Sequence, residues 1–191
     1  MREFTCSLCD ICLINDHKPL LGDGSLDANI MFVSRNPSAF EMKNNIPMIS
    51  KDGMFFQEYL DLFNFSRDEV YITNAVKCKT PNRRYPEDKE IYNCRQYLMN
   101  EITHINPKII VLVGNTAIKS YFGLAFTNLP VTAEQLNGTY MIHNGRVILF
   151  MIHPSHAMST YTTRLALFVS FIQLTNLYRI INPAHTTNFN Y

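Results

Sequence analysis

Polar side chains able to bind a heterocycle stand at the ends of three apolar runs. Asn36 closely follows the run Ile30–Val33. Asn74 lies near the end of a second run, and His153 follows a third. An amide offers a donor and an acceptor together, and an imidazole can donate to a carbonyl oxygen that gains charge. These residue types could therefore read a neutral heterocycle at one site, although each asparagine could instead only cap a helix or close an Asx turn.

Cysteines form a second group. Cys6 and Cys9 have the two-residue spacing that lets a tight turn aim two thiolates at one metal centre. Cys78 follows the second apolar run, and Cys94 lies in the predicted helix after it. This two-plus-two arrangement suits a tetrahedral metal or an iron–sulfur cluster and leaves Cys12 as a spare. The number of cysteines does not separate iron–sulfur from zinc, and unrelated buried thiols are the alternative.

A basic loop comes directly after Asn74. It holds four cations beside the predicted site: Lys77, Lys79, Arg83 and Arg84. Such cations suit contacts with the phosphates of nucleic acid, although a run of charge is usually only a solvated surface. The net charge of the chain is only +1, so binding of nucleic acid would depend on this local patch.

A parallel sheet would bring these groups together. Apolar, β-branched runs predict buried strands, and these alternate with segments of helical spacing. The predicted strands are Ile30–Val33, Val70–Val76, Lys108–Val113 and Arg146–Ile152. Asn144-Gly145 predicts a hairpin turn before the last strand. We expect an α/β fold with a doubly wound, mainly parallel sheet, because the carboxyl ends of parallel strands share one edge where ligands bind.

Composition limits the class of protein. Hydrophobic residues make up 47% of the 191 residues and charged residues 17%, as in a globular protein. No apolar run reaches the length of a membrane span or forms a signal peptide. We therefore expect a soluble, cytoplasmic protein without a membrane partner, and a monomer. We expect one domain over residues 1–181, with a cluster-binding N-terminus at 1–28 and a loose tail at 182–191.

The ordered motifs resemble the uracil-DNA glycosylase superfamily, in particular its iron–sulfur branch, family 4. The resemblance runs from residue 6 to about residue 180. The matching pieces are Cys6-x-x-Cys9, NIMFVSRNPS, YITNAVKCKTPNRR, YNCRQYL, NPKIIVLVGNTA and the late His153-Pro154-Ser155. A lone CxxC or HPS would be a weak signal, whereas the whole set in this order is a specific one.

This resemblance implies a three-layer α/β/α sandwich with a central four-stranded, mainly parallel sheet. It also implies a structural 4Fe-4S cluster, with zinc as the alternative, held by Cys6, Cys9, Cys78 and Cys94. The partner would be DNA, from which a base is flipped out and excised by hydrolysis of its N-glycosidic bond. Asn74 would bind the flipped pyrimidine and His153 would stabilise its O2. The loop at 154–160 would wedge into the duplex, with Ser155, His156 and Met158 as DNA contacts.

Departures from the branch concern the turn after the first strand and the base pocket. The branch usually has a Gly-Glu-Ala-Pro-Gly turn, and Arg35 stands here in place of its acid. The Asn-Pro pair resembles the mismatch-specific and single-strand-selective branches, in which Asn positions the attacking water. We therefore expect Asn36 to position water without a carboxylate base, although Asp52 or Glu41 could still supply one. Arg35 would then lie beside the base.

The pocket departures favour a base bulkier than uracil. Met48 follows Pro47 where the branch has a stacking aromatic residue, and Ser38 stands where the uracil-specific branch excludes 5-substituents with tyrosine. A 5-substituted pyrimidine is plausible, such as the glucosylated hydroxymethylcytosine that superfamily members in phage defence remove. Relaxed uracil activity is the alternative reading of these changes.

Two further functions compete with this one. The chain could be a non-catalytic or covalent DNA-binding member of the superfamily that recognises uracil or abasic DNA. It could also be a zinc-stabilised α/β protein unrelated to DNA.

Overall fold

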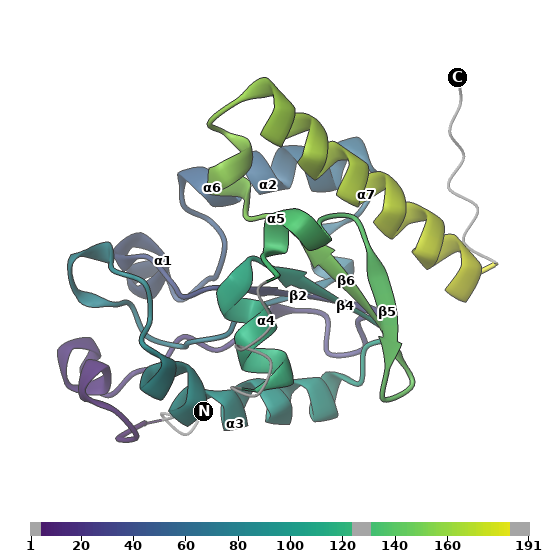
Figure 1. Cartoon of the computed structure of the whole chain (residues 1–191). Helices are drawn as coiled ribbons and strands as arrows, with labels where there is room; N and C mark the ends of the chain where they lie inside the picture. Colours follow the sequence, from purple (N-terminus) through teal and green to yellow (C-terminus); the bar gives the residue numbers. More distant parts are fainter. Residues whose placement is uncertain (1–4, 124–130, 184–191) are drawn as a thin grey trace.

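The computed structural model describes residues 5–123 and 131–183. Within these ranges the sheet has six strands in the order β1-β3-β2-β4-β6-β5 (Figure 1). The strands are β1 (Asp23–Gly24), β2 (Ile30–Ser34), β3 (Tyr71–Asn74), β4 (Ile109–Val113), β5 (Tyr140–His143) and β6 (Arg146–Met151). The central four are parallel, as expected, and β1 and β5 are antiparallel strands at the two edges. The expected count of four strands therefore describes only the parallel centre of the sheet.

Helices cover both faces of the sheet. They are α1 (Ala39–Asn44), α2 (Lys51–Leu62), α3 (Asp88–Ile105), α4 (Asn115–Phe122), α5 (Ala133–Leu136), α6 (Pro154–Ala157) and α7 (Tyr161–Ile181). Short 3₁₀ turns occur at η1 (Asp10–Asn15), η2 (Arg67–Glu69) and η3 (Pro81–Arg83). Helices α2 and α7 lie on one face, and α3 and α4 lie on the other (Figure 1). The three-layer α/β/α arrangement is confirmed.

Alternation along the strands builds two cores. In β2, Phe32 packs with α2 and α7, whereas Met31 and Val33 pack with α3 and α4. This pattern arises because successive side chains of a strand point to opposite faces, and both faces of a parallel sheet are buried. The strands therefore read as continuous apolar runs in the sequence.

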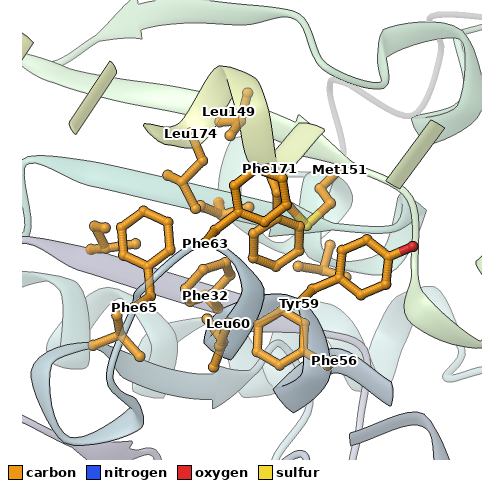
Figure 2. Close-up of a cluster of buried hydrophobic side chains, with 14 of the residues drawn as sticks. Phe32, Phe56, Tyr59, Leu60, Phe63, Phe65, Leu149, Met151, Phe171 and Leu174 are labelled. Carbon is orange, nitrogen blue, oxygen red and sulfur yellow. The ribbon is translucent and has the colours of Figure 1, made fainter. Parts of the chain in front are cut away.

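Aromatic rings fill the core between α2, α7 and the sheet (Figure 2). The ring of Phe32 meets that of Phe56 edge-on at 5.0 Å, and Phe63 stacks on Phe171 at 5.4 Å. Such pairs add to the free energy gained by burial of the rings. Helix α2 follows the Pro47-Met48 turn and α7 follows the His153 segment, so this core fixes two sides of the carboxyl edge of the sheet.

Three short helices were not expected from the sequence: α1, α5 and α6, the last of which begins the segment expected as a loop at 154–160. The first two begin with a capping box, Ser38 with Glu41 in α1 and Thr132 with Gln135 in α5. The hairpin predicted at Asn144-Gly145 is confirmed by the antiparallel pairing of β5 with β6. Most of the tail expected at 182–191 lies outside the described residues, which end at 183. None of the helices in the described ranges is long and apolar enough to cross a membrane.

Candidate active site

The carboxyl ends of the parallel strands bring polar groups together. Ser34 and Asn74 end β2 and β3 and lie side by side in parallel register. His153 comes two residues after β6 and reaches across the end of β4, where its Nε2 lies 3.1 Å from Ser34 Oγ. At that crossing Gly114 has a φ of 85°, a left-handed conformation that favours glycine.

His153 is held as a neutral donor. The backbone N–H of Ser155 donates to its Nδ1 at 3.2 Å, and Ser155 Oγ lies 2.7 Å from the same nitrogen. Since Nδ1 accepts, the neutral ring carries its proton on Nε2, facing Ser34. Burial, with the charge of Arg35 adding to it, lowers the pKa of His153 from 6.5 to about 4. The ring can therefore donate a hydrogen bond at neutral pH without carrying a charge.

Asn74 presents a buried amide with unused capacity. Its side chain is only 3% exposed, and its Nδ2 has no hydrogen-bond partner among the described residues. A buried donor without a partner costs free energy, and such groups are few in folded proteins. The amide is therefore suited to a ligand that offers an acceptor.

The turn after β2 is held by Arg35. Its Nε donates to Asn36 Oδ1 at 2.9 Å, and its guanidinium carbon lies 4.4 Å from the centre of the Tyr85 ring. Asn36 Nδ2 donates to the Pro37 carbonyl at 3.2 Å. Asn36 Oδ1 keeps a second lone pair, because a carbonyl-type oxygen has two. The amide is fixed in place and can still accept a hydrogen bond from water.

The two carboxylates that could have served as a base differ in availability. Glu41 is 5% exposed and accepts from three backbone N–H groups, at 2.7 Å from Ser38, 3.0 Å from Ile49 and 3.4 Å from Ser50. Its oxygens are therefore committed to the turn. Asp52 is half-buried, and burial and the nearby Glu41 charge raise its pKa while Arg35 lowers it.

Ser38 and Met48 have structural contacts of their own. The Ser38 side chain caps α1 by accepting from the Glu41 backbone N–H. Met48 is 5% exposed, packs in the core with α2 and α7, and has a φ of 54°, which is rare for a residue other than glycine. Arg67 donates to the carbonyls of Pro47 and Met48 and holds this turn in place.

An open cavity of about 360 Å³ lies beside His153. Arg35 and Tyr85 line it, together with residues near the start of α4 and α6: Asn115, Thr116, Ser155 and His156. A cavity of this size is within the range of small-molecule sites. The remaining lining comes from Val113, Gly114, Ala133, Glu134, Ile152 and Ser159.

All five cysteines gather in a third buried cluster beside α3. Cys12, the expected spare, is 1% exposed; its Sγ lies 3.2 Å from Cys6 Sγ and 3.6 Å from Cys9 Sγ. Burial raises the pKa of Cys94 to about 11. As the side chains stand, no three His, Cys, Asp or Glu residues of the described chain surround a single metal position. A set of converging thiols nevertheless fits a zinc or iron–sulfur centre in donor chemistry.

Comparison with known proteins decides the family. The family model described as "Uracil DNA glycosylase superfamily" matches residues 21–175. The chain belongs to this superfamily. It is 32% identical over 164 residues to a Type-4 uracil-DNA glycosylase of Thermotoga maritima, a match that covers 86% of this chain and 83% of that protein. Over 160 residues it is also 32% identical to a Type-4 uracil-DNA glycosylase of Sulfurisphaera tokodaii, with 82% and 73% covered. The resemblance to the family 4 branch is thereby confirmed.

Lys77 is buried and does not reach the surface, where a contact with a DNA phosphate would form. Its side chain is 0% exposed, and its Nζ donates to Thr73 Oγ1, to the Asn74 carbonyl and to Glu101. A cation in a basic run was expected at the surface, but an acceptor from α3 pairs with it inside the protein. Lys77 is therefore not available for the phosphate contact that the sequence predicts.

The other three cations of the loop lie nearer to solvent. Arg84 forms a two-pronged pair with Glu90, at 2.8 and 2.6 Å, so its guanidinium closes the loop onto the start of α3. Arg83 is exposed and Lys79 is half-buried. These last two are the cations of the loop best placed to meet a phosphate.

The segment after His153 forms the rim of the cavity. Ser155 orients the imidazole, and His156 Nε2 lies 3.0 Å from Glu134 Oε1 on α5. Met158 is half-buried at the end of α6. Of the expected DNA contacts here, Ser155 and His156 are exposed.

Several residues of the site were missed in the sequence. Ser34 lies just outside the predicted strand Ile30–Val33, whereas in the structure it is the last residue of the buried strand β2 and directly precedes Arg35. Tyr85 and Asn115 line the cavity. Tyr85 lies between the basic residues and Pro86, a position that could have indicated an aromatic residue on a nucleic-acid surface.

Proposed function

We propose that this protein flips a pyrimidine out of DNA and hydrolyses its N-glycosidic bond to leave an abasic site. Membership of the superfamily makes the chain a DNA glycosylase, a hydrolase of N-glycosyl bonds. The observation that carries the proposal for this site is the unpartnered Asn74 amide at the same sheet edge as the neutral donor His153. Together they match a base with a carbonyl oxygen.

The reaction follows from these positions. The bond between the sugar C1′ and the base nitrogen breaks with its electron pair on the base, so negative charge develops on the base carbonyls. Asn74 holds the base. The hydrogen bond that His153 Nε2–H donates to Ser34 is replaced by one that it donates to O2 of the base. Such a preorganised donor stabilises the developing charge. Asn36 positions the water that adds to C1′, and the proton that water loses leaves to solvent.

The preferred base is proposed to be larger than uracil. Met48 stands where the branch has a stacking aromatic residue, and Ser38 stands where a tyrosine would exclude 5-substituents. The open cavity beside His153 and Arg35 offers room for a substituent. A 5-substituted pyrimidine, such as glucosylated hydroxymethylcytosine, is the specific substrate that we propose, with phage DNA as its source.

The cysteine cluster is proposed to hold a structural 4Fe-4S cluster, with zinc as the alternative. Cys78 and Cys94 would supply two thiolates and the N-terminal segment two more, Cys6 and Cys9 in the sequence assignment. The metal centre would cross-link the N-terminus to the loop after β3 and would take no part in the reaction on DNA. A brown protein with iron and sulfide in it supports this assignment; zinc without iron replaces it.

A substrate panel tests the function. Oligonucleotides with one uracil, hypoxanthine, 5-hydroxymethylcytosine or glucosylated 5-hydroxymethylcytosine are incubated with the protein, and free base and alkali-labile sites are measured. We expect release of at least one pyrimidine by the wild type, and loss of release in Asn36→Ala and His153→Ala. Tight DNA binding without release of any base would identify a non-catalytic member of the superfamily instead.

A further inference from the structure

We infer that Lys77 is a positioning residue that links the cysteine cluster to the base-reading side chain Asn74. This inference rests on the proposed function, because it gives Lys77 a role in reading the base. Lys77 is buried, and the mechanism above gives it no part. The inference rests on the contacts of its ammonium group and of its backbone.

The ammonium end is fully satisfied inside the protein. Lys77 Nζ lies 2.7 Å from Thr73 Oγ1, 2.7 Å from the Asn74 carbonyl oxygen and 2.5 Å from Glu101 Oε2. An ammonium has three donors, so each of them has one acceptor. Glu101 is 11% exposed in its side chain and also accepts from Thr73 Oγ1 at 2.8 Å. Buried ion pairs are weak evidence for stability and are retained in some proteins because they specify one conformation.

That conformation is the one that aims Asn74. Lys77 Nζ donates to the Asn74 carbonyl, and the two residues after Asn74 are tied to the end of β2 and to the turn after it. Ala75 N–H donates to the Ser34 carbonyl at 2.8 Å, and Val76 N–H donates to the Arg35 carbonyl at 3.0 Å. The backbone of Asn74 is thus fixed on both sides, which presets the direction of its unpartnered amide.

The backbone end of Lys77 lies on the cysteine cluster. Its N–H donates to Cys94 Sγ at 3.2 Å, and its carbonyl accepts from Leu20 N–H at 2.7 Å. Cys94 and Glu101 both lie on α3, about two turns apart and so on similar faces. One residue therefore contacts the cluster through its amide and Asn74 through its ammonium.

Binding to two kinds of DNA separates positioning from stability. One oligonucleotide carries 2′-fluoro-2′-deoxyuridine or 2′-fluoro-5-hydroxymethyl-2′-deoxycytidine, whose glycosidic bonds resist hydrolysis. The other has the same sequence with a tetrahydrofuran abasic analogue. The ratio of the two dissociation constants measures reading of the base alone. The variant is Lys77→Met/Glu101→Gln, which removes both charges; the amide oxygen at residue 101 can still accept from the Gly22 N–H, and its NH2 can donate to Thr73 Oγ1.

We expect the preference of this double variant for base-containing over abasic DNA to fall about tenfold, close to the fall in Asn74→Ala. Its affinity for abasic DNA should stay within about twofold of the wild-type value. Adding Asn74→Ala to the double variant should cost nothing further, because the two changes act on one contact. Lys79→Met, a matched change in the same loop, should weaken both DNAs equally.

Two failures are distinguishable. A wild-type protein that binds both DNAs equally overturns the proposed function and this inference with it. A wild-type preference for the base that survives in the double variant overturns the inference alone. A single Lys77→Met variant that fails to fold while the double variant folds and reads the base normally also overturns it, because Lys77 would then serve stability only.

Discussion

His153 and Ser34 are joined by a 3.1 Å contact between Nε2 and Oγ that crosses the end of β4. The imidazole and the hydroxyl come from strands that are not neighbours, since β4 lies between β2 and β6. Ser34 holds the Nε2 donor in place, and in the proposed reaction the base carbonyl would take over from Ser34 as its acceptor. The donor therefore needs only to exchange partners when a base enters, and little reorganisation is required.

Removing this donor should slow release of the base. We expect His153→Ala to lower the single-turnover rate by about 10²–10³-fold, the usual effect of losing one such hydrogen-bond donor. Ser34→Ala should cost much less, because it removes only the resting partner of Nε2. Quenched-flow assays of base release on the best substrate of the panel measure both. Equal losses in the two variants would contradict the exchange of partners.

The pH dependence should reflect the low pKa of His153. In the neutral ring Nδ1 accepts from the Ser155 N–H while Nε2 donates. Protonation, with a pKa of about 4 in the folded protein, would place a hydrogen on Nδ1 and break the contact that orients the ring. The rate should not fall on account of His153 between pH 8 and pH 5, and should fall near pH 4. Arg35→Met removes a positive charge that disfavours the imidazolium, so the acidic limb should move upward. A limb at pH 6.5 in the wild type would contradict the assignment.

The folding stability of the protein should also depend on the protonation of His153. In the unfolded chain His153 titrates near 6.5, whereas in the folded protein it stays neutral down to about 4. The unfolded state therefore binds more protons between these values, and stability falls as the pH drops from 6.5 toward 4. His153→Gln should flatten the stability profile in this window, which urea denaturation at several pH values measures.

The sequence predicts the parts of the fold that depend on local pattern. Buried parallel strands are continuous apolar runs, and the hairpin at Asn144-Gly145 is encoded by its turn. Lys77 was misjudged because its burial depends on Glu101, which is 24 residues further on. Cys12 was set aside for a similar reason: spacing shows which thiols can pair, but only the path of the chain shows which are enclosed. The helix α5 had a local signal, the Thr132 and Gln135 capping box, that was overlooked.

Gly53 should be required for the turn that places Met48. A Cβ at residue 53 would stand 2.2 Å from the Met48 carbonyl carbon and oxygen, which are backbone atoms that Arg67 also holds. Alanine usually stabilises a helix by about 1 kcal/mol relative to glycine. Here Gly53→Ala should instead destabilise the protein by about 1–3 kcal/mol, as overpacking does. Urea denaturation measures it, and Met54→Ala at the exposed neighbouring position is the control.

Two cations of the loop after β3, Arg83 and Arg84, should differ in what their removal changes. Arg83 is exposed, so Arg83→Ala should lower the slope of log K against log salt by about 1 without changing the melting temperature. Arg84 pairs with the buried Glu90, so Arg84→Ala should lower the melting temperature. Salt-dependent DNA binding and thermal melting of each variant distinguish them. Loss of salt dependence in Arg84→Ala at unchanged stability would show that Arg84 contacts DNA directly.

Substitution of single cysteines should reveal which thiols hold the metal centre that we propose. Cys12 is 1% exposed and adjoins both Cys6 and Cys9, whereas Cys9 is half-buried. A thiolate ligand must be enclosed with the others, so Cys12→Ser should lower the iron or zinc content at least as strongly as Cys78→Ser, and more strongly than Cys9→Ser. Metal analysis and visible absorption of the purified variants measure this. Full metal content in Cys12→Ser, with loss in Cys9→Ser, would instead support the set Cys6, Cys9, Cys78 and Cys94.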